Sequence, residues 1–173
     1  MKKIIIFLVL FTKIGTSQDT LAFQLLNQYR AYYGKPALEM NISFAKYAID
    51  HCNNMMLKSS IWHPKNRPSN KECVAMTRKG EYYLHGKMLE KIQWMGKVFN
   101  IDTATITNNE FAILNSLYGY DHSPPHKKIL LANDNANGYF HINIDLIEKK
   151  YCKFTKLTYY VMKLNSCINI NRK

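Results

Sequence analysis

The sequence predicts an α+β fold in which the helices come first and the strands come last. In residues 22–38 and again in residues 44–56, apolar side chains recur at the spacing of amphipathic helices. Residues 133–138 are rich in Asn and Gly, which predicts a turn. After it, residues 139–146 alternate between polar and apolar, and residues 157–164 are dense in aromatic and β-branched side chains. Helices followed by strands are typical of the α+β class, so we expect these two strands to pair.

Each helix has a recognisable boundary or face. The first ends where Gly34 interrupts the pattern, and a polar loop, residues 59–70, follows the second. Residues 81–95 carry a stripe of aromatic and Met side chains at helical spacing, which predicts a core-facing helix. A cofactor-binding role for this stripe is the alternative. We expect a further helix over residues 108–118, with Asn108 as its cap.

Ser123, Pro124 and His126 mark the start of a short helix. Ser is a favoured N-cap, and Pro suits the first helical position because its missing N–H would have no partner there. His126 then occupies the third position, where unpaired backbone N–H groups and the helix dipole disfavour a charged imidazolium. We therefore expect a neutral imidazole, which can ligate a metal or accept a proton, with simple packing at the helix start as the alternative.

Residues 1–17 have the features of a secretory signal peptide. A basic start is followed by an apolar run, residues 4–11, and by small residues up to Ser17. We expect cleavage after Ser17, a single mature domain of residues 18–173 and a secreted or periplasmic location. No segment is long and apolar enough to span a bilayer, so we expect no transmembrane segment. We also expect a monomer.

The chain is strongly basic. It has 24 Lys and Arg residues against 12 Asp and Glu residues, a formal net charge of +12. The basic residues occur in scattered pairs, such as Lys127 and Lys128, and form no long run, so we expect no nucleic-acid partner. An anionic envelope polymer or lipid headgroup would be attracted by this charge. A solvated surface that favours solubility is the alternative.

Four cysteines are compatible with two disulfides in an oxidising compartment, and four thiols allow three pairings. We favour Cys52–Cys73 and Cys152–Cys167, because the members of each pair are close in sequence. No Cys-x-x-Cys pattern of a zinc site occurs.

Four short patterns follow one another within residues 20–165. They are Asn-x-x-Arg before Gly-x-x-x-Leu, a histidine after the second helix, a glutamate, and an aromatic-x-x-Ser-Pro-x-His segment. In this order they resemble the CAP superfamily of cysteine-rich secretory proteins, antigen 5 and pathogenesis-related proteins, and most closely its bacterial branch. The matched residues are Asn27, Arg30, Gly34, Leu38, His63, Glu72, Tyr120, Ser123, Pro124 and His126.

The chain departs from the family pattern around Glu72 and at Ser123, and the stretch between these two residues is longer than usual. Lys71, Glu72 and Cys73 stand where the bacterial branch has Gly-Glu-Asn. Ser123 stands where many animal and plant members have a second glutamate. A four-residue His/Glu constellation of the family's kind is therefore incomplete in this chain.

The resemblance implies a three-layer α-β-α sandwich with a mainly antiparallel sheet between helices. It also implies that His63, Glu72 and His126 converge in a cleft. Two imidazoles and a carboxylate can bind a divalent metal such as zinc, with His63 and His126 as ligands, or can position a water and move its proton. A structural role for Glu72, holding its loop by hydrogen bonds, is the alternative. His122, just before His126, either joins the cleft or faces solvent.

Two functions remain open at this stage. One is a secreted binding module whose cleft or surface recognises a lipid, a cell-envelope component or a protein partner. The other is a metal-assisted, peptidase-like hydrolase with Glu72 as its base. Common catalytic signatures are absent, and Ser123, if it caps a helix, is a poor nucleophile. Of the remaining histidines we expect His51 at the surface and His141 on the polar face of a strand, and we find no sequence partner for His85.

Overall fold

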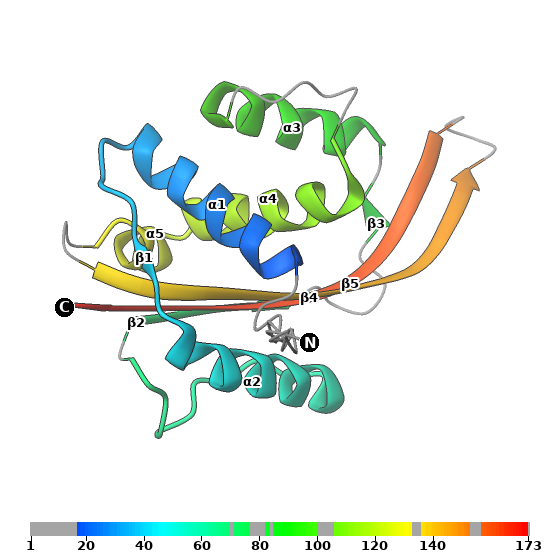
Figure 1. Cartoon of the computed structure of the whole chain (residues 1–173). Coiled ribbons are helices and arrows are strands. Elements are labelled where there is room, and N and C mark those ends of the chain that lie inside the picture. The colour runs from blue at the N-terminus through cyan, green and yellow to red at the C-terminus, as the bar shows by residue number, and fades with distance from the viewer. Residues whose placement is uncertain are drawn as a thin grey trace, which may run out of the picture.

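The computed structural model describes residues 17–69, 71–76, 82–83, 85–99, 106–132, 136–152 and 157–172. In this part of the chain a sheet lies between two helical layers (Figure 1). The elements in chain order are α1 (Ser17–Tyr32), β1 (Glu39–Met40), a 3-10 turn η1 (Ile42–Phe44), α2 (Ala45–Lys58), β2 (Lys71–Met76), β3 (Tyr82–Tyr83), α3 (His85–Phe99), α4 (Asn108–Asp121), α5 (Pro124–Leu130), β4 (Ala136–Cys152) and β5 (Leu157–Arg172).

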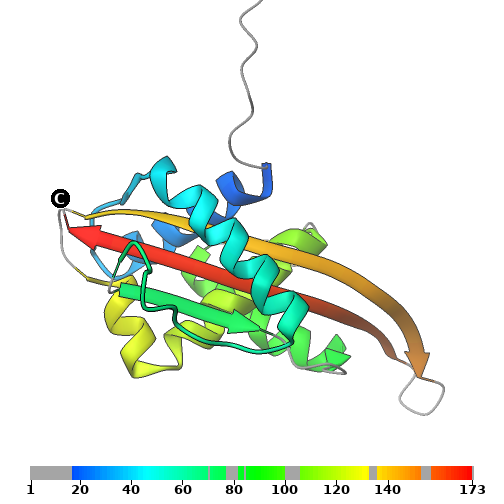
Figure 2. The ribbon, with the colours of Figure 1, turned by 90° about the horizontal axis from the view of Figure 1, so that it is seen from below.

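The sheet is mixed but mainly antiparallel. Its strand order is β1-β4-β5-β2, and β3 also pairs with β5. Among the strands that the structure describes, only the short β1 runs parallel to its neighbour, β4. Helices α1, α3, α4 and α5 cover one face, while α2 covers the other (Figure 1). Figure 2 shows α2 crossing the strands on its own side of the sheet. The predicted three-layer α+β sandwich is therefore confirmed.

Both faces of the central strands are buried. Along β4, Phe140 and Ile142 join the larger core beneath α1 and α4, whereas Tyr139 joins a smaller core beneath α2. His141 points the same way as Tyr139 and is also buried, with its Nδ1 atom 2.9 Å from an Asp19 carboxylate oxygen. The predicted alternation of side chains along this strand is therefore correct. The expectation that His141 lies on a solvent-facing polar face was wrong, because α2 and the start of α1 cover that face.

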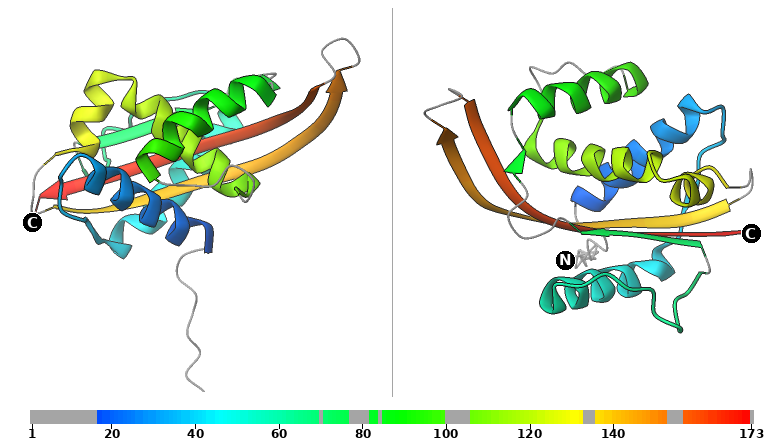
Figure 3. Two further views of the ribbon diagram at one scale, coloured as in Figure 1. Left: turned by 90° about the horizontal axis from the view of Figure 1, so that it is seen from above. Right: turned by 180° about the vertical axis from the view of Figure 1, so that it is seen from behind.

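The hairpin of β4 and β5 is longer than the sequence indicated. The two strands have 17 and 16 residues, and they curve beyond the helices at one end (Figure 3). Residues 136–138, which we expected in a turn, begin β4 instead. The rest of that turn, residues 133–135, lies outside the described residues.

The Asn-x-x-Arg pattern of α1 holds the chain segment that follows the helix. Asn27 accepts a hydrogen bond from the Leu38 N–H at 2.9 Å and donates to the Leu38 carbonyl at 3.2 Å. Arg30 is fully buried and donates to the carbonyls of Pro36 and Leu130, at 3.0 and 2.6 Å. Since Leu130 is the last residue of α5, Arg30 also fixes that helix, which carries His126.

Two helix starts differ from the prediction. The cap of α4 is Thr107 rather than Asn108, and it forms a reciprocal capping box with Glu110. Ser123 occupies the N-cap position of α5, as predicted, but its side chain makes no capping hydrogen bond. The two prolines that follow occupy the first two helical positions and have no N–H to offer, which leaves only the N–H of His126 in reach.

The predicted disulfide pairing is wrong. None of Cys52, Cys73 and Cys167 forms a disulfide bond in the described part of the chain. Cys52 and Cys73 belong to different cores on opposite faces of the sheet. Cys152 pairs with Leu157, the first residue of β5, so Cys167 lies about 33 Å further along the strand. Disulfides need Cα atoms within about 7 Å of each other, so neither predicted pair can form in this fold.

The expected signal peptide, apart from Ser17, lies outside the described residues. Ser17 is the first residue of α1, so the expected cleavage site falls at the start of that helix. None of the helices that the structure describes is both long and apolar enough to cross a membrane.

Candidate functional site

Glu72 is the buried centre of the predicted site. It lies on β2, not on a loop as the sequence suggested, and only 3% of it is exposed. One carboxylate oxygen lies 2.7 Å from Nδ1 of His63. The other accepts a hydrogen bond from the Tyr47 hydroxyl at 2.7 Å and a longer one from the Cys167 thiol at 3.5 Å. Three side chains from α2, β5 and the loop before β2 therefore occupy this carboxylate.

The strand period explains why Glu72 faces these partners. Successive strand residues point to opposite faces of a sheet, and the next residue of the same parity, Val74, packs in the core beneath α2. Cys73 points the other way and contacts the His126 carbonyl at 3.8 Å. The short β2 thus joins the buried carboxylate on one face of the sheet to α5 on the other.

His63 is the exposed partner of this pair. Its side chain is 42% exposed, in contrast with the buried carboxylate that it contacts. Nδ1 is used by Glu72, and Nε2 has no hydrogen-bond partner among the residues that the structure describes. A carboxylate that holds one imidazole nitrogen fixes the orientation of the ring and leaves the other nitrogen for an external partner.

His126 occupies the third position of α5, as predicted, and is half-buried beside the Tyr120 ring, with ring centroids 5.4 Å apart. Burial, and secondly the charge of His63, lower the pKa of His126 below its ordinary value of 6.5. The direction of this shift agrees with the expected neutral imidazole, and burial is its largest cause. The two imidazoles are therefore near enough for the charge of His63 to affect the pKa of His126.

His122 does not belong to this cluster. It is exposed at the end of α4, where Nδ1 bonds the Tyr118 carbonyl at 2.9 Å. Its ring lies 4.0 Å from the Tyr118 ring and 5.8 Å from the Trp94 ring, measured between centroids. Of the four predicted cleft residues, the structure joins His63 to Glu72 at 2.7 Å and places His126 where the charge of His63 affects its pKa. His122 contacts none of these three in the described part of the chain.

These donors do not fit a three-ligand zinc site. Zinc sites in proteins use three or four protein ligands. Within the described ranges, no group of three or more His, Cys, Asp or Glu side chains is placed to hold a metal ion. The Glu72 oxygens are also already engaged by hydrogen-bond donors. Glu72 is therefore not available as a zinc ligand, and only the imidazoles of His63 and His126 are left as candidate ligands.

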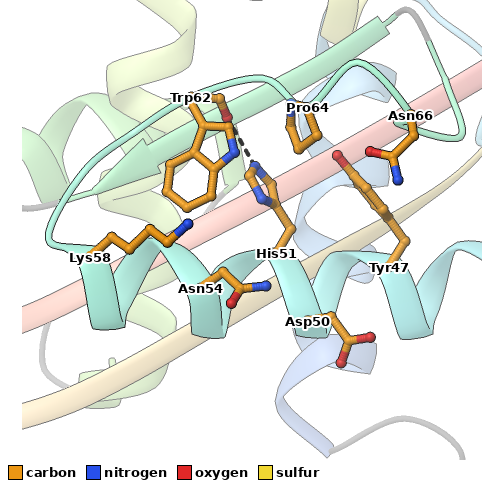
Figure 4. A pocket seen from close by; sticks show the side chains of 8 residues that line it. All are labelled: Tyr47, Asp50, His51, Asn54, Lys58, Trp62, Pro64 and Asn66. Atoms are coloured by element: carbon orange, nitrogen blue, oxygen red, sulfur yellow. Dashed lines mark hydrogen bonds between the residues drawn. The ribbon is translucent and has the colours of Figure 1, made fainter.

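Sequence reasoning missed a second feature beside His63. A pocket lies between α2 and the loop that carries Trp62 (Figure 4). His51, expected at the surface, is buried at its wall, and its Nε2 atom lies 3.0 Å from the Trp62 carbonyl oxygen. The sequence signal that could have revealed this pocket was the helical spacing of the polar residues along α2. The lining residues are Tyr47, Asp50, His51, Asn54, Lys58, Trp62, Pro64 and Asn66.

Comparison with known proteins gives one match. The family model of the cysteine-rich secretory protein family, CAP, matches residues 23–138. This range contains His63, Glu72 and His126. No curated protein and no solved structure matches the chain. The match is to the family as a whole, so assignment to its bacterial branch stays a prediction.

Proposed function

Because the chain belongs to the CAP family of cysteine-rich secretory proteins, we propose that it is an exported binding module that recognises a cell-envelope component without turning it over. The state of Glu72 carries the proposal. A general base must reach the proton that it removes, directly or through one water. Glu72 is 3% exposed, and His63, Tyr47 and Cys167 contact its oxygens, so its role is to orient His63.

The surface around His63 supports recognition of an external partner. The loop before β2 presents the exposed Ile61 and the basic Lys65 close to the exposed imidazole. At the adjacent end of α2, Leu57 is 84% exposed. Apolar and basic side chains on one surface suit an envelope component that combines apolar and anionic groups, and the net charge of +12 favours the same class of partner.

The proposal is tested by co-sedimentation of the purified protein with isolated cell envelopes, followed by analysis of the supernatant for released fragments. We expect sedimentation with the envelopes and no fragments. His63→Ala should weaken sedimentation, whereas Gln28→Ala, an exposed change on α1, should not. Release of fragments that Glu72→Gln abolishes would overturn the proposal in favour of the hydrolase.

Export is tested separately. The signal-peptide features predict that the product has its N-terminus at or near Gln18. Mass spectrometry of the product recovered outside the cytoplasm measures this directly. A product that retains Met1 and stays inside the cell would contradict export.

A further inference from the structure

The pocket between α2 and the Trp62 loop is not lined by Glu72 or His63, although Tyr47 both lines it and bonds Glu72. Tyr47, His51, Asn54 and Lys58 project from one side of α2 at helical spacing, and the loop closes over them (Figure 4). The cavity has a volume of about 360 Å³. Sites for small molecules span roughly 300–1,000 Å³, so the cavity suits a small ligand or one unit of a larger one.

One wall of the pocket is aromatic and held in place by the fold. The Tyr47 and His51 rings stack with centroids 5.6 Å apart, and the Trp62 ring meets His51 edge to face at 5.2 Å. His51 is buried and bonded to the Trp62 backbone, while the Tyr47 hydroxyl is bonded to Glu72. The wall therefore exists before any ligand arrives, which reduces the entropy lost on binding.

The pocket also offers polar groups that the protein does not use. The side-chain amides of Asn54 and Asn66 have no hydrogen-bond partner in the described part of the chain. Each amide can donate and accept. Lys58 places its ammonium 5.0 Å from the centre of the Trp62 ring, and its exposed side chain can move away to admit a ligand.

We propose that this pocket binds a pyranose unit of a saccharide. A pyranose ring presents a flat C–H face, which packs on an aromatic ring, and a rim of hydroxyl groups, which both donate and accept hydrogen bonds. The aromatic wall and the two amides of the pocket match these two parts. The inference rests on the proposed function for the class of ligand, an envelope polymer. Its residues differ from those of the Glu72 network except for Tyr47, which belongs to both.

Two other classes of ligand fit less well. A lipid chain requires an apolar lining, whereas every lining residue except Pro64 carries a polar group in its side chain. A phosphate or sulfate would be attracted by Lys58 but repelled by the carboxylate of Asp50. That carboxylate forms an exposed pair with Lys46 at 2.7 Å, so its charge is only partly balanced. An uncharged saccharide meets neither difficulty.

Tryptophan fluorescence provides the test. The chain has two tryptophans, so Trp94→Phe leaves Trp62 as the reporter in the pocket. We expect a saturable change on titration with N-acetylglucosamine trimer or glucose trimer, and the ratio of the two affinities reports whether an acetamido group is recognised. Inorganic phosphate and phosphatidylglycerol vesicles serve as the anionic and lipid probes. Saturation by either of these, with no response to a saccharide, would overturn the inference.

Asn53 and Asn54 are neighbours on α2, and only Asn54 lines the pocket, so their variants form a matched pair. Asn54→Ala and Asn66→Ala should each weaken saccharide binding about threefold to tenfold, the effect of losing one hydrogen bond. Asn53→Ala changes the same residue type on α2 outside the pocket and should leave the affinity unchanged. Equal affinities for the Asn53 and Asn54 variants would overturn the inference, even if the protein binds saccharide elsewhere.

The same variants separate this inference from the proposed function. If envelopes still sediment the Asn54 and Asn66 variants and no saccharide binds, only the pocket inference fails. If the wild type cleaves the saccharide while these variants lose affinity for it, the binding-module proposal fails and the pocket stands.

Discussion

Glu72 and His63 lie 2.7 Å apart as a buried carboxylate and an exposed imidazole. Tyr47 and Cys167 satisfy the other Glu72 oxygen, so the carboxylate is fixed from both sides. Burial, and then the hydrogen bond to Glu72, raise the pKa of the Tyr47 hydroxyl, which keeps it a donor. The pair is therefore a rigid support for His63, with the open imidazole nitrogen as its functional end.

Glu72→Ala should lower the free energy of unfolding by about 1–3 kcal/mol, because the half-buried Tyr47 hydroxyl and the buried Cys167 thiol lose their shared acceptor. Urea denaturation measures this loss. Asp50→Ala is the control, because its pair with Lys46 is exposed and should contribute less than about 1 kcal/mol. Equal losses in the two variants would show that the Glu72 network is not stabilising.

The free energy of unfolding should fall in mild acid because His126 is harder to protonate in the folded protein than in the unfolded chain. Burial and the charge of His63 lower the pKa of folded His126 below 6.5, while the unfolded chain keeps the ordinary value. Between the two values the unfolded state binds more protons, so this contribution is complete above pH 6.5 and is lost as the pH falls through the folded pKa. Urea denaturation of the wild type and His126→Gln across this range should give a shallower pH dependence for the variant.

Proton NMR titration of the His126 ring checks the same prediction directly. The midpoint should lie below 6.5 and should rise towards it in His63→Ala. A midpoint at or above 6.5 in the wild type would contradict the burial of the imidazole.

The two helix caps should differ in their contribution to stability. Thr107→Ala breaks the capping box of α4 and should cost about 0.5–2 kcal/mol. Ser123→Ala should cost less than about 0.5 kcal/mol, because its side chain makes no capping bond. Thermal denaturation of the two variants measures the loss of stability at two N-cap positions of the same protein. A larger loss for Ser123→Ala would mean that its hydroxyl bonds the His126 N–H after all.

Cys73 and Cys167 should resist alkylation in the folded protein. Burial raises the pKa of both thiols, so little nucleophilic thiolate forms. Iodoacetamide should modify them slowly in the native state and completely in denaturant without reductant. Peptide mass spectrometry identifies the modified residues, and a disulfide-linked peptide containing either cysteine would contradict the packing of the two cores.

Local chemistry determined the order of the elements and the start of the helix that carries His126. Helical periodicity and strand alternation are set by residues close in the chain, so they identified α1, α2, α3, α4 and the inner parts of β4 and β5. The Ser-Pro-Pro segment fixed His126 at the third helical position because Pro is favoured at a helix start. The sequence order of the short patterns also indicated the family that the CAP match establishes.

Tertiary packing decided the rest, because these features depend on residues far apart in the sequence. The six-residue β2 exists through its pairing with β5, and that pairing turns Glu72 towards Tyr47 and Cys167. Cysteines that are close in sequence lie on opposite faces of the sheet or at distant points of the hairpin. His141 and His51 are buried because a helix and a loop cover them, and the pocket exists only where that loop meets α2.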